Sequence, residues 1–208
     1  MSRGVSFLIG VLTVLTAVAL AVLVPMQSTA QFEKGLMQTV NREAVGMSES
    51  DLTAFARETM DYLCARKQTW EPQTPFAIPG SFVLHMAQVR AGVSACWWAV
   101  ALAVCSVLIV LLFGRIDRSW HCAGMSAAAG MIALVLLWAA VDFNRLWYLI
   151  HRLLIPGGIF SASEPVMQLF SLQLFFGYIG PVMGMLAAMG ALIALFSVAL
   201  YRRARTTR

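Results

Sequence analysis

Two histidines are the residues of this sequence whose type and position could carry chemistry. The chain has 208 residues and three histidines, of which His85 and His151 lie next to long apolar segments. A neutral imidazole has a pKa of about 6.5, so a histidine can accept or donate a proton at neutral pH. Paired histidines on two helices can also be the axial ligands of a haem iron. The two residues therefore leave general acid–base catalysis and haem binding open as alternatives.

Polar side chains accompany both histidines at helical spacing. Because a helix has about 3.6 residues per turn, Gln88 shares a face with His85, and Tyr148 and Arg152 fall on turns adjoining His151. A polar cluster at a membrane surface suggests a functional site, whereas interfacial anchoring and binding of lipid phosphate are the ordinary alternatives. The side chains that we expect to bind substrate in such a site are Arg90, Arg152, Tyr148, Arg145 and Gln88.

Other catalytic signatures are missing from the sequence. It contains no Gly-x-Ser-x-Gly motif, and no serine or cysteine nucleophile can be placed near the expected site. The four cysteines form no Cys-x-x-Cys pair, and no His-Glu-x-x-His or similar ligand spacing is present. We therefore expect no metal, no cofactor and buried cysteines without a reactive role. If the protein is an enzyme, its substrate must supply the nucleophile.

The elements that carry the histidines are expected to be membrane helices. Hydrophobic residues make up 60% of the sequence and charged residues 12%, compared with about 45–50% and about 25% in soluble domains. The first apolar run exceeds the roughly 7–15 residues of a signal-peptide core, so we interpret it as an anchored span. We expect an all-α integral membrane protein, a single membrane domain over residues 1–208. Its four transmembrane helices are expected at about 5–25, 92–113, 122–141 and 178–200.

Arginines determine the expected orientation of these spans. They precede the first span, join spans two and three, and follow the fourth, and cationic loops favour the cytoplasm. Both termini are therefore expected in the cytoplasm, with segments 26–91 and 142–177 outside it. The net charge of +5 then reflects topology, and we expect no nucleic-acid partner. The third histidine, His121, falls on the cytoplasmic side beside Arg118 and Trp120, where interfacial anchoring is its expected role.

The outer segments are expected to form a small helical cap over the spans. Ser48 and Asp51 have the spacing of a capping box and begin an amphipathic helix that runs to about residue 66. Residues 165–176 are expected to form a helix that lies in the membrane interface. With this topology, His85 and His151 lie at the same extracytoplasmic membrane face.

The order of these features resembles the bacterial lipoprotein intramolecular transacylase family over most of the chain. The resemblance rests on a first span, the helix "GMSESDLTAFARETMDYL", the segment "LHMAQVR" before span two, and "LWYLIHRLLIPGGIF" after span three. Gln88 stands where the family usually has an acidic residue. The two signatures of the family are matched here by His85, Met86, Val89, Arg90 and His151.

The resemblance implies an acyltransferase of the bacterial cell membrane, with its active site at the extracytoplasmic face. Such an enzyme moves the sn-2 acyl chain of a diacylglyceryl-modified lipoprotein to the α-amine of its N-terminal cysteine, giving a lyso-form lipoprotein. We expect both histidines to be catalytic, with His151 as general base and His85 as general acid, although the sequence alone leaves the opposite assignment open. The expected partners are lipoproteins and membrane lipid, with no obligate protein partner. The alternative is a non-catalytic four-helix membrane protein that binds haem through the paired histidines or is a scaffold for a partner.

Overall fold

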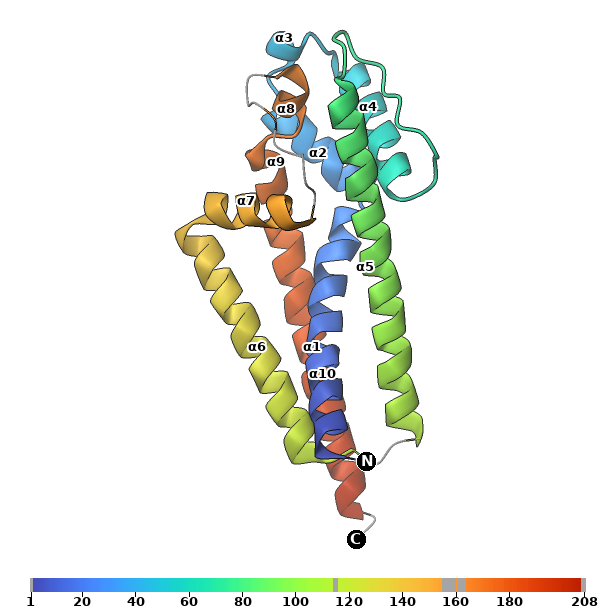
Figure 1. Cartoon of the computed structure of the whole chain (residues 1–208), viewed down its shortest axis with the longest axis vertical. Coiled ribbons are helices and arrows are strands. Elements are labelled where there is room, and N and C mark those ends of the chain that lie inside the picture. Colours follow the sequence, from blue (N-terminus) through green and yellow to red (C-terminus); the bar gives the residue numbers. More distant parts are fainter. Residues whose placement is uncertain (1, 114–115, 155–159, 161–163, 207–208) are drawn as a thin grey trace.

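The chain folds into long helices that carry a cluster of short helices at one end. The computed structural model describes residues 2–113, 116–154, 160 and 164–206, and these contain helices and no strand. Figure 1 shows α1, α5, α6 and α10 along the long axis, with the start of α1 and the end of α10 at the end opposite the short helices. The all-α prediction is confirmed for the described residues. In chain order the helices are α1 (Arg3–Met26), α2 (Thr29–Thr39), α3 (Arg42–Val45), α4 (Glu49–Leu63), α5 (Gly80–Phe113), α6 (Arg118–Val141), α7 (Phe143–Leu154), α8 (Pro165–Leu169), α9 (Leu172–Phe176) and α10 (Ile179–Thr206).

Three of the described helices are long and apolar enough to cross a membrane, namely α1, α6 and the Gly80–Ile109 part of α5. A fourth candidate is the pair Pro165–Phe176 and Ile179–Ile193, which is bent by 41° at a break. The described residues therefore provide three spans, or four if the bent pair crosses as one. The cytoplasmic position of both termini stays a prediction.

Helix α5 is longer than a span requires, and this length positions His85. It is one unbroken helix of 34 residues, which at about 1.5 Å per residue extends about 50 Å. The hydrocarbon core of a bilayer is only about 30 Å thick. The predicted span 92–113 therefore occupies part of α5, and the first turns, which carry His85, continue beyond it alongside the short helices (Figure 1).

Helices α1 and α6 cross at very short range because two glycines lie at their contact. A Cβ on Gly124 would lie 2.0 Å from the carbonyl oxygen of Phe7, and one on Gly10 would lie 2.1 Å from that of His121. Near this crossing the backbone N–H of Asp117 donates to the buried Ser6 Oγ at 2.9 Å. Small residues allow membrane helices to approach until their backbones touch. The crossing holds the ends of α1 and α6 together, far from the short helices.

The short helices form a cap with its own apolar core. The predicted capping box is confirmed, because Ser48 Oγ accepts from the Asp51 N–H and the Asp51 carboxylate accepts from the Ser48 N–H at the start of α4. Trp70 packs edge-on against Phe55 in this core, with ring centroids 6.1 Å apart, and its Nε1–H donates to the buried Thr59 hydroxyl at 3.1 Å. The cap therefore has the packing of a small folded domain, attached to the spans through α1, α5 and α10.

The segment 165–176 differs from its prediction. The sequence predicts one interfacial helix, whereas the structure has two short helices, α8 and α9, that are interrupted at Phe170 and Ser171. Leu169 and Leu174 are fully buried in the cap core. Their apolar pattern therefore reflects packing against protein. The Pro-Gly-Gly sequence at 156–158, which is expected to turn the chain after His151, lies outside the described residues.

Candidate active site

Two helices from different parts of the sequence bring His85 and His151 together. His85 lies in the second turn of α5, and His151 lies in the last turn of α7. Their imidazole rings are nearly parallel, with centroids 6.1 Å apart and planes at 25°. Figure 1 shows α7 crossing the long axis directly below the cap, a direction that carries its last turn toward α5. The expected proximity of the two histidines is therefore present in the fold.

Aromatic side chains surround His85. The ring centroids of Phe82 and Phe160 lie 5.6 Å and 5.3 Å from that of His85, and these two phenylalanines contact each other at 4.9 Å. The Nδ1 atom of His85 is buried and has no hydrogen-bond partner among the described residues. No described carboxylate or carbonyl therefore holds a proton on Nδ1 of His85.

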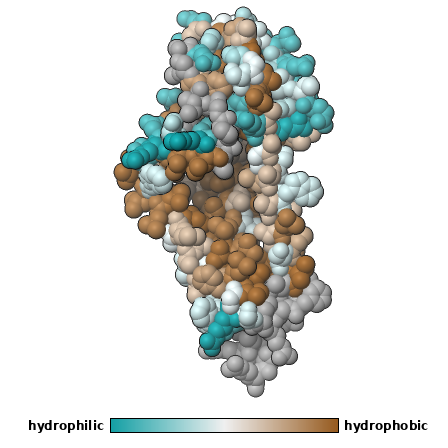
Figure 2. Space-filling view, viewed as in Figure 1, coloured by the Kyte–Doolittle hydropathy of each residue, from teal (hydrophilic) through white to brown (hydrophobic). Residues whose placement is uncertain are grey.

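Both histidines line one cavity of about 860 Å³ between the cap and the spans. This volume is within the usual range of about 300–1,000 Å³ for ligand pockets. Figure 2 shows the molecular surface hollowed below the cap, with hydrophobic residues around the hollow. The wall is formed largely by methionine, leucine, valine and phenylalanine side chains. Its apolar residues include Leu23, Met26, Phe32, Met60, Leu63, Phe82, Met86, Val89, Val93, Phe160, Met167, Phe170, Leu172 and Phe175.

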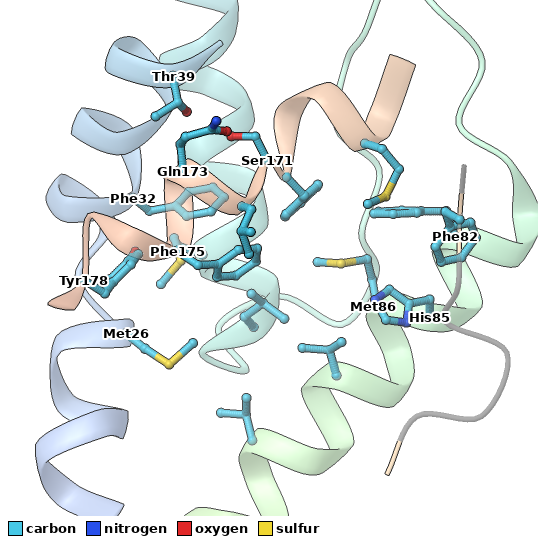
Figure 3. Close-up of a pocket in the computed structure, with 18 of the residues that line it drawn as sticks. Met26, Phe32, Thr39, Phe82, His85, Met86, Ser171, Gln173, Phe175 and Tyr178 are labelled. Carbon is cyan, nitrogen blue, oxygen red and sulfur yellow. The ribbon is translucent and has the colours of Figure 1, made fainter. Parts of the chain in front are cut away.

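The polar part of the cavity wall carries hydroxyl, amide and imidazole groups. Its members are Gln27, Thr39, Asn41, Asn144, Gln168, Ser171, Gln173 and Tyr178, besides the two histidines. No aspartate, glutamate, lysine or arginine is among the described lining residues. Figure 3 shows Thr39, Ser171 and Gln173 on the side of α2 and α9, across the cavity from His85 and Met86. The cavity therefore offers uncharged hydrogen-bonding groups and two titratable imidazoles.

Cys64 is the one cysteine among the described lining residues of the cavity. Burial raises the pKa of its thiol above the usual range, and the nearby Arg66 offsets this only in part. A thiol with a raised pKa has little thiolate at neutral pH and is a poor nucleophile. This agrees with the expectation that the protein supplies no nucleophile.

The five expected substrate-binding residues lie outside the cavity lining. Arg90 is turned toward the cap, where its guanidinium donates to the carbonyl of Gln68 at 3.0 Å and lies 4.7 Å from the ring centroid of Tyr62. The half-buried Gln88 does not line the cavity either. These contacts show that Arg90 fastens the chain after α4 to the start of α5. Its role in binding stays a prediction.

The orientation of helix α7 places His151 in the cavity wall and its arginines outside it. Asn144 precedes His151 by seven residues, which is two turns, and both side chains line the cavity. Arg145 and Arg152 have the same spacing one position further along the chain and are exposed, as is Tyr148. Helix α7 is thus amphipathic, with one face on the cavity and a cationic face outside. The seven-residue spacing of Asn144 and His151 was the signal in the sequence for this additional lining residue.

The described residues contain no group of three or more histidine, cysteine, aspartate or glutamate side chains that could hold a metal ion. Within the described cavity wall, the groups that could take part in a reaction are the two imidazoles and the neutral polar side chains. The fold and this site define a class: a membrane-integral helical protein with a paired-histidine cavity under a cap.

The chain belongs to the family of the lipoprotein intramolecular transacylase Lit, whose sequence pattern matches residues 7–158. No curated protein sequence matches the chain. Its fold is similar to that of the membrane-integral lipoprotein intramolecular transacylase Lit from Bacillus cereus, with a TM-score of 0.78, 12% identity, and coverage of 98% of this chain and 97% of that one. A structure of that protein with its own H85R mutation has a TM-score of 0.79 and 11% identity over 99% and 94% of the two chains. The predicted family is confirmed.

Proposed function

We propose that this protein moves the sn-2 acyl chain of a diacylglyceryl-modified lipoprotein to the α-amine of its N-terminal cysteine. The observation that supports this best is the pair of imidazoles, 6.1 Å apart, in the wall of a largely apolar cavity. An acyl chain fits an apolar wall, and two adjacent imidazoles can take up one proton and deliver another. Membership of the transacylase family supports the same reaction.

The absence of charge in the cavity wall favours the reactive form of the amine. An α-amine has a reference pKa of about 7.7–8.0, so in water at pH 7 most of it is protonated and not nucleophilic. A low-polarity cavity without a carboxylate disfavours an ammonium ion and therefore lowers the pKa of the bound amine. No described lining residue is acidic, so the cavity itself assists deprotonation.

In the proposed reaction, His151 takes a proton from the amine as its nitrogen attacks the ester carbonyl. The new C–N bond leaves an oxyanion, and collapse of this intermediate breaks the bond between the carbonyl carbon and the sn-2 glycerol oxygen. His85, in its imidazolium form, donates a proton to that oxygen as it leaves. Transfer of the proton held by His151 to His85 then restores both residues for the next turnover. The products are an amide at the cysteine and a free glycerol hydroxyl, so no water or cofactor is consumed.

Cavity shape is expected to contribute as much as the histidines. Amine and ester belong to one substrate, and good intramolecular orientation can be worth about 7–11 kcal/mol. A general base contributes about 10²–10⁴-fold, which is less in free energy. The aromatic and methionine side chains that shape the cavity around His85 therefore fold the bound lipid toward the reactive geometry.

Expression of the protein in bacteria that lack lipoprotein N-acylation tests the function. Mass spectrometry of a lipoprotein's N-terminal peptide should show N-acylated monoacylglyceryl cysteine with the wild type and unchanged diacylglyceryl cysteine with His151→Ala. His121→Ala is the matched control, because His121 lies at the other end of the molecule and does not line the cavity. Absence of the product with the wild type, or equal amounts with His151→Ala, would contradict the proposal. A Soret band lost in His85→Ala would favour the haem alternative.

A further inference from the structure

Ser171 lines the cavity and has a hydroxyl group without a hydrogen-bond partner among the described residues. It occupies the position before α9 where a serine side chain normally accepts a backbone N–H, yet it makes no such hydrogen bond. Ser28 and Ser48, at the starts of α2 and α4, both accept one. The Ser171 Oγ is buried and has no hydrogen-bond partner among the described residues, and Ser171 lines the cavity.

An unsatisfied buried hydroxyl destabilises a folded protein unless a ligand or a water molecule supplies the missing hydrogen bond. Other neutral polar groups lie on the same wall. The amide side chains of Gln168 and Gln173 and the hydroxyl of Thr39 all line the cavity, and Figure 3 shows Thr39, Ser171 and Gln173 together, across from His85. Thr39 already donates its hydroxyl hydrogen to the carbonyl of Gly35, so its oxygen can only accept. Amides and hydroxyls together offer both donors and acceptors.

The chemistry of this wall fits the main chain of a peptide. A phosphate or carboxylate group needs cationic partners when it is buried, and no described lining residue is charged. Peptide N–H and C=O groups are neutral and need both acceptors and donors, which this wall provides. Leu23, Met26 and Val93 line the part of the cavity next to the spans. Acyl chains therefore fit on the span side, and the peptide that follows the modified cysteine fits on the cap side.

We propose that Ser171, with Gln168 and Gln173, forms a subsite for the main-chain amides of the lipoprotein segment that follows the acylated cysteine. The subsite rests on the proposed function for the nature of its substrate. It makes Ser171 a residue that determines specificity for a peptide-bearing lipid over a lipid with no peptide. It takes no part in the proton transfers at the two histidines.

Binding of unreactive analogues to the full-length protein in detergent tests the subsite. Both analogues carry ether-linked alkyl chains that cannot be transferred. One continues from the cysteine into four further residues, and the other ends at a cysteine methyl ester. Ser171→Ala should weaken binding of the peptide analogue about fivefold, the effect of one hydrogen bond, and leave binding of the methyl ester within about twofold. Ser106→Ala is the matched control, because the Ser106 hydroxyl is exposed on α5 and donates to the carbonyl of Leu102.

Each other result has a separate meaning. Equal weakening of both analogues by Ser171→Ala would place its hydroxyl on the glycerol part and overturn the subsite, as would no weakening of either. If the wild type turns over diacylglyceryl lipopeptide but binds the two analogues equally, the subsite is wrong and the proposed function stands. If the wild type neither binds the analogues nor turns over the lipopeptide, both are wrong. The melting temperature of ligand-free Ser171→Ala should not fall, because no hydrogen bond is removed.

Discussion

His85 and His121 occupy similar local environments at opposite ends of the molecule. Both are half-buried, both lie in the first turns of a long helix, and both have a buried Nδ1 with no hydrogen-bond partner among the described residues. Of the two, His85 lines the cavity below the cap and His121 does not, and His85 has a second imidazole 6.1 Å away. A histidine with a buried Nδ1 that lacks a partner is therefore not by itself a sign of a reactive site, since the α1–α6 crossing contains one too.

The two regions also use small and large side chains differently. At the His121 end, Gly10 and Gly124 remove all space between α1 and α6. At the His85 end, Phe82 and Phe160 pack around the imidazole and help to keep a volume of about 860 Å³ open between the cap and the spans. Close packing excludes a ligand, whereas bulky walls around a gap can hold one. Close packing at the His121 end therefore stabilises the fold, whereas the His85 end leaves room for a ligand.

The largest expected effect comes from alanine substitution at the two compared histidines. His85→Ala should lower kcat for a diacylglyceryl lipopeptide by about 10²–10⁴-fold, because it removes the proposed proton donor. His121→Ala should change kcat less than about threefold, because His121 packs at the α1–α6 crossing and has no part in the proposed reaction once the protein is folded. Turnover of purified variants, followed by mass spectrometry of the N-acylated product, measures both. A large kcat loss in a folded His121→Ala protein would break the comparison.

A smaller effect is expected at the α1–α6 crossing. Gly124→Ala places a methyl group 2.0 Å from the Phe7 carbonyl oxygen, and overpacking of this kind costs about 1–3 kcal/mol. Gly130→Ala on the same helix meets no atom within 4 Å and should slightly stabilise the protein, by about 0.5–1 kcal/mol, because alanine is the better helix former. Thermal unfolding in detergent, followed by tryptophan fluorescence, should therefore show shifts of opposite sign. Equal shifts would mean that the crossing is looser than the structure has it.

The sequence predicted the parts of this comparison that follow from helical periodicity. The apolar runs, the Ser48–Asp51 capping box and the meeting of His85 with His151 all follow from spacing and topology. The orientation of α7 did not, because Asn144 and Tyr148 are one helix turn apart and both are exposed, yet only Asn144 lines the cavity. Only tertiary packing decides which face of such a helix points inward.

The cap also limits what the sequence could predict. Leu169 and Leu174 have the apolar character of a membrane-interface helix, and only the fold shows that they are buried in protein. Because Leu169 and Leu174 are buried, Ser171 between them lies in the wall of the cavity. Ser171 is one of three polar residues in the otherwise apolar stretch 165–176, with Gln168 and Gln173. This signal is ambiguous because serine is common before helices. The uncharged character of the cavity needed the folded chain, since its lining comes from segments far apart in sequence.

The smallest expected effect is a change in the alkylation rate of Cys64, at the His85 end, compared with Cys122, at the His121 end. Cys64 lines the cavity, whereas Cys122 follows His121 on α6. Because burial raises the pKa of the Cys64 thiol, its alkylation by iodoacetamide should be slower at pH 8 than that of a cysteine in a short peptide. The rate should then rise by about tenfold per pH unit until the pH passes the raised pKa, since only the thiolate reacts. Mass spectrometry of the alkylated peptides measures both cysteines in one sample.

The unreactive peptide analogue should slow alkylation of Cys64 and leave the alkylation rate of Cys122 unchanged. Equal protection of the two cysteines would show that the ligand does not distinguish the His85 end from the His121 end.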